Sequence, residues 1–259
     1  MKIAQFKFWV VSIVFFAISS CTNDTNDQAK LLKKIIETSD SGVVKTILFD
    51  YNGSNILSID SDKSRKDFIY TDNLITKIST TDKVAVTTIS VDYSYQNNKL
   101  IQVKSPDNYY TNYIHNSNGT ISYEKFDIGI PNVETKLYHG TLFFSNRNLV
   151  KEERILDDTD VNTISKYDVT YEYGYSQNPY FNIIGFDKLL DYDDLISRNN
   201  YSISTVETSV EKNGQIISSA IFYKNNFKYN SINYPIENNS IVSIPEKGIS
   251  YTVKTEYFY

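Results

Sequence analysis

The 259-residue sequence is poor in residues that commonly carry chemistry: it contains one cysteine and two histidines. A single cysteine cannot form a disulfide within the chain, and two isolated histidines do not provide the ligand spacing of a zinc site. The sequence also lacks the G-x-S-x-G, Walker A and HExxH motifs of nucleophilic, phosphate-binding and zinc enzymes. We therefore expect a protein that is not an enzyme, with no catalytic residue, no metal and no cofactor.

Glycine, proline, tryptophan and methionine are scarce as well, with 9, 5, 1 and 1 residues. Basic residues number 26 against 31 acidic ones, so the net charge is −5, and the positive charge that a nucleic-acid partner requires is missing. A single apolar run near the N-terminus excludes a bundle of membrane-spanning helices. Tyrosine and phenylalanine are abundant, with 22 and 14 residues, which favours β-strands over helices.

The first twenty residues have the organisation of a secretory signal peptide. Lys2 and Lys7 flank the start of the chain, an apolar stretch covers residues 8–17, and small residues lead to Cys21. The run Ile-Ser-Ser-Cys at residues 18–21 resembles a bacterial lipobox, in which the signal is cleaved before the cysteine and the thiol receives a diacylglycerol. The resemblance implies lipidation of Cys21. The alternative is an ordinary cleavage site with an incidental cysteine.

Residues 21–30 are polar and without periodicity, which predicts a flexible tether from the lipidated cysteine to one folded domain over residues 31–259. The chain without its signal has 24 basic and 31 acidic residues, a net charge of −7, so we expect contact with a membrane only through the lipid. These features predict a monomer in the cell envelope, anchored to the outer membrane. They leave open whether it faces the periplasm or the cell surface.

An irregular repeat organises the rest of the chain. In each unit, aromatic residues two apart precede a short polar loop, and aliphatic residues two apart follow it, which is the pattern of a β-hairpin. The units include Phe49, Tyr51, Ile56, Leu57 and Ile59; Tyr93, Tyr95, Leu100, Ile101 and Val103; Tyr113, His115, Thr120, Ile121 and Tyr123; and Leu142, Phe144, Leu149, Val150 and Glu152. Consecutive units predict an all-β fold, an antiparallel meander of hairpins forming a curled, barrel-like sheet.

The loops between the paired segments are rich in asparagine and glycine, which tolerate positive φ in tight turns. If Phe49 and Tyr51 share a face with Leu57 and Ile59, the loop between them has an odd number of residues. We therefore predict an odd-numbered loop in the first hairpin.

Three short segments, FDYNG at residues 49–53, YEY at 171–173 and FKYN at 227–230, resemble tyrosine-aspartate (YD, Rhs-type) repeats. Most of residues 31–259, including the segment YNSINYP at residues 229–235, resembles uncharacterised Bacteroidota lipoproteins more closely still. This resemblance implies a porin-like or barrel-like β fold and does not imply an activity. Asparagine or glutamine often stands where the YD pattern has aspartate, which separates this chain from true Rhs repeats.

Two segments depart from the hairpin pattern. Residues 187–197 (DKLLDYDDLIS) show helical spacing behind Asp187 as N-cap, which predicts a short helix covering an edge or an open end of the sheet. Residues 31–36 fit a helical stripe or a strand, and we predict a strand because a turn and a β-rich run follow.

Both histidines and the acidic clusters are interpreted as parts of the scaffold. His115 occupies a position that aromatic residues hold in other repeat units, and His139 lies at the entrance of a predicted strand. The acidic clusters, which we expect to be solvated, are Asp60 and Asp62; Asp157, Asp158 and Asp160; and Asp191, Asp193 and Asp194. Arg65 and Thr71 stand where a calcium-binding loop needs glycine and a bidentate glutamate.

The sequence as a whole predicts a non-enzymatic envelope lipoprotein that is structural or ligand-binding. Tyr109, Tyr110 and Tyr113 are candidates for stacking on a glycan or peptide ligand, because they follow a predicted loop and adjacent tyrosines in a strand point to opposite faces. Two alternatives stay open: an envelope glycan hydrolase with paired carboxylates in a cleft, and a small outer-membrane β-barrel. The lipobox argues against the membrane-embedded barrel, because a lipid anchor is redundant for a protein that the bilayer already holds. Lys33, Lys34, Glu152 and Glu153 argue against it too, because adjacent charges place one of each pair on either face of a strand.

Overall fold

The computed structural model describes residues 30–105, 108–130, 133–157, 159–160 and 162–259, so the predicted signal peptide and Cys21 lie outside the described residues. The chain forms strands with short connections. Their bounds are β1 Lys34–Ser39, β2 Val44–Asn52, β3 Asn55–Ser61, β4 Ser64–Thr71, β5 Leu74–Asp82, β6 Thr87–Gln96, β7 Lys99–Ser105, β8 Tyr109–His115, β9 Ile121–Ile130, β10 Val133–Ser145, β11 Asn148–Leu156, β12 Thr163–Gln177, β13 Asn199–Lys212, β14 Gln215–Tyr229, β15 Pro235–Ile244 and β16 Ile249–Phe258.

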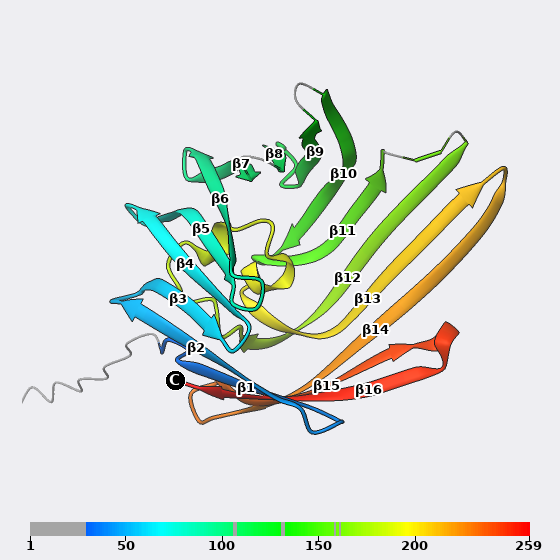
Figure 1. The fold of residues 1–259 in the computed structure, drawn as a ribbon. Coiled ribbons are helices and arrows are strands. Elements are labelled where there is room, and N and C mark those ends of the chain that lie inside the picture. Colours follow the sequence, from blue (N-terminus) through cyan, green and yellow to red (C-terminus); the bar gives the residue numbers. More distant parts are fainter. Residues whose placement is uncertain (1–29, 106–107, 131–132, 158, 161) are drawn as a thin grey trace, which may run out of the picture.

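Each strand pairs antiparallel with the next one along the chain, and β1 also pairs with β16, so the sheet closes into a barrel (Figure 1). In the closing pair, Ile35 of β1 lies opposite Tyr257 of β16. The predicted all-β meander of consecutive hairpins is therefore confirmed, and the ambiguous stretch before residue 37 contributes strand β1. Closure removes the two unpaired sheet edges that an open meander leaves exposed.

The two faces of the barrel wall differ in chemistry. Inward-facing residues are mainly aromatic or aliphatic and form one buried core, which includes Phe49, Phe68, Tyr93, Leu100 and Leu142. Outward-facing residues are mainly polar and pair across neighbouring strands; the ion pairs on this face include Lys77–Asp92, Lys136–Glu124, Lys151–Glu153 and Lys254–Glu256. Exposed apolar side chains, such as Leu48, Ile69, Ile114 and Ile241, also lie on this face among the charged residues.

A β-bulge explains the spacing of the repeat. In the first hairpin, Tyr51 lies opposite Ile56 while Phe49 lies opposite Ile59, so Leu57 is an extra residue that points outward and is exposed. Register shifts at the equivalent place occur in the β4–β5, β6–β7 and β10–β11 hairpins. The predicted odd-numbered loop is wrong, because a two-residue turn followed by one bulged residue produces the same spacing between inward-facing residues.

The second aromatic residue of a unit contacts the backbone of the preceding hairpin beside its bulge. Side-chain groups donate to backbone carbonyls in three such contacts: Tyr95 to Ile75 at 2.9 Å, His115 to Leu100 at 2.9 Å and Tyr173 to Leu149 at 2.6 Å. Tyr70 instead accepts from the backbone N–H of Ile56 at 3.2 Å. These contacts satisfy backbone groups where the bulge interrupts the ladder, so the repeated aromatics join one hairpin to the next.

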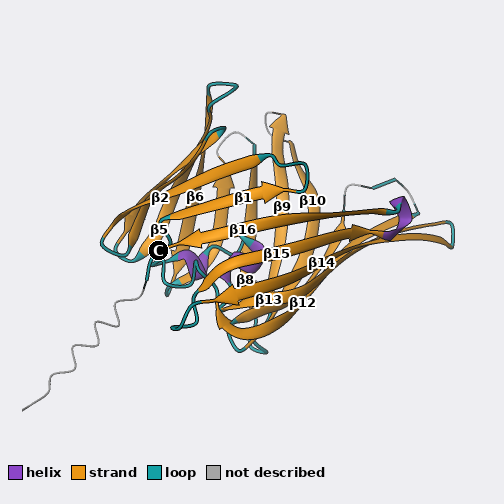
Figure 2. Cartoon of the chain, turned by 90° about the horizontal axis from the view of Figure 1, so that it is seen from below, coloured by secondary structure: helices purple, strands orange, loops and turns teal. Residues whose placement is uncertain are grey.

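The segment between β12 and β13, residues 178–198, leaves the wall and packs inside one end of the barrel; we call it the plug (Figure 2). The predicted helix over residues 187–197 is wrong, because this segment contains only two 3-10 turns, η1 Phe186–Lys188 and η2 Asp193–Ile196. The third 3-10 turn, η3 Pro245–Lys247, joins β15 to β16. We expected this segment to cover an edge or an open end of the sheet, and the plug does lie at one end of the barrel, inside the wall.

Close contacts with the hairpin turns hold the plug. Ile184 accepts from the Tyr70 hydroxyl at 2.9 Å, and its N–H donates to the carbonyl of Ser54. Gly185 has φ of +77°, and a Cβ there would lie 2.9 Å from the carbonyl oxygen of Asn73. Glycine is required at this position because both the backbone conformation and the space exclude a side chain.

The two ends of the barrel differ. At the plug end, turns rich in asparagine, glycine and serine surround the plug, and Lys30 contacts Asn182 and Tyr234 there. At the opposite end, the hairpin tips carry exposed aliphatic residues, among them Val43, Val84, Val86, Ile216 and Ile217. We call this the open end. No helix in the described ranges is long and apolar enough to cross a membrane.

Candidate ligand-binding site in the barrel lumen

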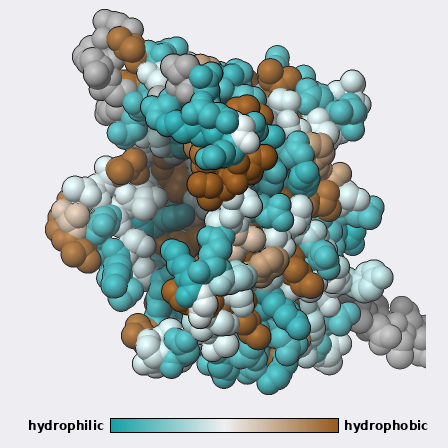
Figure 3. All heavy atoms as spheres, turned by 90° about the vertical axis from the view of Figure 1, so that its right-hand side faces the viewer, coloured by the Kyte–Doolittle hydropathy of each residue, from teal (hydrophilic) through white to brown (hydrophobic). Residues whose placement is uncertain are grey.

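A cavity of about 780 Å³ lies between the plug and the barrel wall. Seen from the right-hand side of Figure 1, the surface is hollowed, and both hydrophobic and hydrophilic residues surround the hollow (Figure 3). The cavity volume lies within the range of small-molecule binding sites. Residues from the plug, from β1, β4 and β6, and from the long strands β13–β16 line it.

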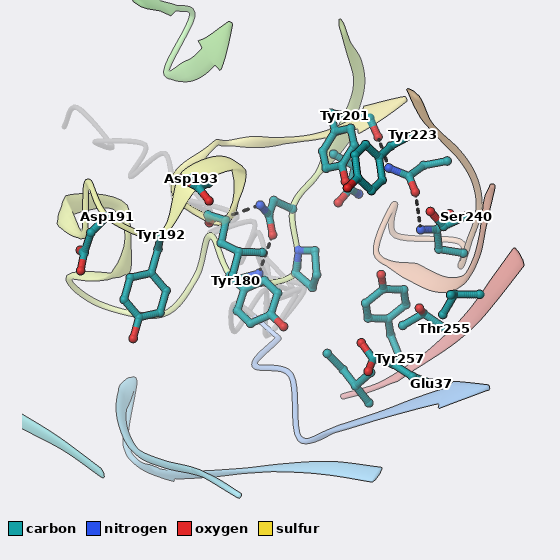
Figure 4. Close-up of a pocket in the computed structure, with 18 of the residues that line it drawn as sticks. Glu37, Tyr180, Asp191, Tyr192, Asp193, Tyr201, Tyr223, Ser240, Thr255 and Tyr257 are labelled. Carbon is teal, nitrogen blue, oxygen red and sulfur yellow. Dashed lines mark hydrogen bonds between the residues drawn. The ribbon is translucent and has the colours of Figure 1, made fainter. Parts of the chain in front are cut away.

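Tyrosine rings and short polar side chains dominate the cavity lining (Figure 4). The tyrosines that line it are Tyr93, Tyr109, Tyr180, Tyr192, Tyr201, Tyr223 and Tyr257, and the asparagines are Asn178, Asn199, Asn200, Asn225 and Asn238. Aromatic faces offer stacking surface, and amides offer both donors and acceptors. Such a lining suits a ligand with flat apolar faces and many hydrogen-bonding groups.

Asp191 of the plug projects into this cavity. Its side chain faces the lumen space, which the plug and the wall strands enclose. This enclosure raises the pKa of Asp191 to about 6, while the Tyr93 hydroxyl, which donates to Oδ2 at 2.9 Å, acts in the opposite direction. Burial likewise raises the pKa of Asp193, which lies two residues on. Both carboxyls are therefore held in a setting that disfavours their charge.

Two lysines face the lumen and lie against tyrosine rings. Lys66 donates to the Tyr192 hydroxyl at 3.2 Å, and its Nζ lies 4.7 Å from the centroid of that ring. The Nζ of Lys125 lies 3.8 Å from the ring centroid of Tyr109. Burial lowers the pKa of both lysines, and Asp191 opposes that effect at each of them. The cavity therefore contains charges of both signs.

A smaller recess of about 190 Å³ adjoins the main cavity and contains a buried charged network. Glu152 is 3% exposed; it accepts from the Tyr123 hydroxyl and from Arg154, whose Nη2 lies 2.6 Å from Oε1. Tyr123 reaches the pair by crossing Gly140, where a Cβ would collide with the tyrosine ring. Each charged group has a partner of opposite charge, as burial requires.

The three predicted stacking residues separate in the structure. Tyr109 lines the cavity, and Tyr113 is buried in the wall with its ring 6.1 Å from that of Tyr123. Tyr110 points outward, stacks on Phe126 at 4.9 Å and donates to Glu134. Adjacent tyrosines do point to opposite faces, but only Tyr109 is placed to contact a molecule in the lumen.

The other candidates occupy ordinary structural positions. Outside the barrel, His139 contacts Asp157 at 2.8 Å, and Asp160 pairs with Lys212 at 3.3 Å. Asp60 pairs with Lys83 at 2.6 Å. Within the described residues, no group of three or more histidine, cysteine, aspartate or glutamate side chains is arranged to hold a metal ion.

Sequence reasoning missed two elements of the site. Glu152 occupies a repeat position that Ile59, Ile78 and Val103 hold in other hairpins, and a charge at an inward position signals a buried partner. We expected Asp191 to belong to a solvated acidic cluster. Its position in the lumen arises only when the barrel closes around the plug. No local pattern in the sequence reports that position.

Comparison with known proteins supports the fold. The structure is similar to the crystal structure of a porin-like protein from Bacteroides uniformis, with a TM-score of 0.50 and 12% sequence identity, over 88% of this chain and 97% of that chain. No protein-family model and no curated protein matches the sequence. The implied porin-like fold, a closed antiparallel barrel, is therefore present.

Proposed function

We propose that this chain is a non-enzymatic lipoprotein of the cell envelope whose barrel lumen binds a small polar ligand, a glycan fragment or a peptide. The observation that carries the proposal is the cavity of about 780 Å³ with its lining of tyrosine rings and asparagine amides. A barrel of sixteen strands leaves space that the wall side chains do not fill, and here the plug and the wall shape that space into a pocket whose aromatic and amide groups suit a ligand.

The outer face of the barrel supports a body that lies in water and reaches the membrane through a lipid. A lipid-facing barrel needs an apolar band about 25 Å tall, and charged side chains at its middle are destabilising. Here Lys77, Asp92, Lys136 and Glu124 form ion pairs on that face. In this proposal the lipid on Cys21 anchors the protein to the outer membrane, and the tether joins the barrel at the plug end, where Lys30 lies.

A small barrel within the outer membrane is the second candidate. The likeness to the porin-like protein favours it, and so do the exposed aliphatic residues at the open end, such as Val84, Val86 and Ile217. The two candidates differ in one measurable property. The mature chain expressed from residue 21 with Cys21→Ser should stay monomeric in buffer without detergent if the barrel lies in water. Aggregation that detergent reverses would favour the membrane-embedded barrel.

A glycan hydrolase is the third candidate, because Asp191, Asp193 and Glu37 line one cavity and the pKa of Asp191 is raised to about 6. A carboxyl whose pKa is raised toward neutral keeps part of its population protonated near that pH, as a general acid requires. Release of reducing ends from envelope polysaccharide by the parent, and loss of that release in Asp191→Asn, would establish hydrolysis. Binding without product release supports the non-enzymatic proposal.

A tryptophan side chain that occupies the cavity tests whether the ligand binds in the lumen. Ser240 lines the cavity, whereas Ser243 lies three residues on along the same strand and points outward. We expect calorimetric titration with di- to tetrasaccharides from envelope polysaccharide, or with a tryptic peptide mixture, to detect binding to the parent and to Ser243→Trp. Ser240→Trp should not bind. Equal binding by both tryptophan variants would contradict a site in the lumen.

A further inference from the structure

Two asparagines on the long strands form a hydrogen-bonded pair at the cavity wall. Asn225 of β14 donates from Nδ2 to the backbone carbonyl of Tyr201 at 3.2 Å. Asn238 of β15 donates from Nδ2 to Oδ1 of Asn225 at 2.9 Å. A backbone carbonyl only accepts, so the first contact fixes which end of the Asn225 amide is the NH₂ group, and the second then fixes Asn238.

This fixed orientation leaves one acceptor without a donor. Oδ1 of Asn238 has no hydrogen-bond partner among the described residues, although the residue is only 6% exposed. A buried carbonyl without a partner is unfavourable, and such atoms in folded proteins call for an explanation. Asn238 lines the cavity, so a molecule in the lumen is the available source of a donor.

The residues around Asn238 indicate which kind of molecule would bind there. Phe227 lies directly opposite it on β14, and Thr255 lies opposite it on β16, with Glu37 next in the same row on β1. Neighbouring strands place these groups about 4.8 Å apart. The row offers a ring face at one side and, beside it, the unpartnered carbonyl of Asn238 and a hydroxyl, while the Glu37 carboxylate is paired with Lys45 at 3.2 Å.

We propose that the Asn225–Asn238 pair is a subsite for a hydroxyl-rich ligand, a saccharide, which stacks on an aromatic ring and donates a hydroxyl to Oδ1 of Asn238. The inference rests on the proposed ligand-binding function and narrows its ligand class. Oδ1 of Asn238 has less than 1 Å² exposed, so a ligand hydroxyl reaches it with a small movement of the Asn238 side chain. Peptide backbone supplies one N–H donor per residue, flanked by Cα groups, and reaches such a recessed acceptor less easily than a hydroxyl that projects from a sugar ring.

The test replaces both amides. Leucine has nearly the shape of asparagine, and exchanging both members of a buried polar pair for apolar groups preserves packing while removing the acceptor. The double variant also removes the donor to the Tyr201 carbonyl, so we expect Asn225→Leu/Asn238→Leu to stay folded in the absence of ligand and to melt a few degrees below the parent. The matched control is Asn226→Leu/Asn239→Leu, because these residues lie opposite one another on the same two strands and face outward.

The probes are di- to tetrasaccharides from dextran, chitin and mannan hydrolysates, with a tryptic peptide mixture as the competing class. We expect at least one saccharide fraction to bind the parent and the control equally, and to bind the inner double variant with a Kd about tenfold weaker. Unchanged saccharide affinity in the inner variant overturns the subsite. Peptide binding that depends on Asn225 and Asn238 overturns the saccharide class while leaving a lumen site intact, and no binding by either class contradicts both.

Discussion

The hydroxyl of Tyr95 donates to the backbone carbonyl of Ile75 at 2.9 Å, and this carbonyl lies directly before the bulged residue of the β4–β5 hairpin. The bulge removes that backbone group from the regular ladder, so the tyrosine of the next hairpin satisfies it. His115 and Tyr173 make the same contact with Leu100 and Leu149. The abundance of tyrosine in this chain is therefore partly a consequence of repeated bulges.

Loss of one such contact should weaken the barrel. Tyr95→Phe keeps the ring and leaves the Ile75 carbonyl without its partner, so we expect the free energy of unfolding to fall by about 1–2 kcal/mol. Tyr251→Phe is the control, because Tyr251 is 39% exposed. Chemical denaturation measures both changes, and equal stabilities of the two variants would contradict a bonding role for the hydroxyl.

Asp191 should make stability depend on pH. Enclosure raises its pKa from 3.8 in the unfolded chain to about 6 in the folded barrel, so the fold favours the protonated form. That contribution is fully present below pH 3.8 and is lost as the pH rises through 6. Asp191→Asn should therefore raise the melting temperature at pH 7 and leave it nearly unchanged at pH 3.5.

The melting curves of Asp191→Asn need a surface control, for which Asp160→Asn is suited because the Asp160 side chain is 82% exposed. A pH-independent difference between Asp191→Asn and the parent would show that the carboxyl is not held in an unfavourable setting.

The buried pair of Glu152 and Arg154 should behave as a unit. Glu152→Leu leaves the Arg154 guanidinium buried without its carboxylate, so we expect a loss of about 3 kcal/mol in unfolding free energy. Glu152→Leu/Arg154→Leu removes both charges and should recover most of that loss. A double variant no more stable than Glu152→Leu would show that the unpaired Arg154 charge does not cause the loss.

The alternation of aromatic and aliphatic residues was sufficient to predict the hairpins, because one face of each strand is buried and the other is not. The bulges were not predictable from spacing, since a two-residue turn with one bulged residue places Phe49 and Ile59 on one face just as a longer loop does. The helical spacing of Leu189, Tyr192 and Leu195 misled, because the plug is surrounded by wall and buries apolar residues on several sides without a helix.

The candidate site was predictable only in part. Tyr109 was found because adjacent tyrosines in a strand must alternate, and one of them had to face inward. The cavity itself joins β1, the plug and the long strands β13–β16, which come together only when the barrel closes. Asn225 and Asn238 are 13 residues apart in sequence and carry no motif.

Occupancy of the lumen can be measured directly by cysteine protection. With Cys21→Ser the mature chain has no thiol, so Ser240→Cys places a single thiol in the cavity and Ser243→Cys places one on the outer face. At a saccharide concentration about ten times the Kd, about a tenth of the sites stay free. The account predicts that the saccharide slows maleimide labelling of the Ser240→Cys thiol about tenfold and leaves that of Ser243→Cys unchanged. Equal labelling rates at the inner thiol with and without bound saccharide would contradict a ligand site in the lumen.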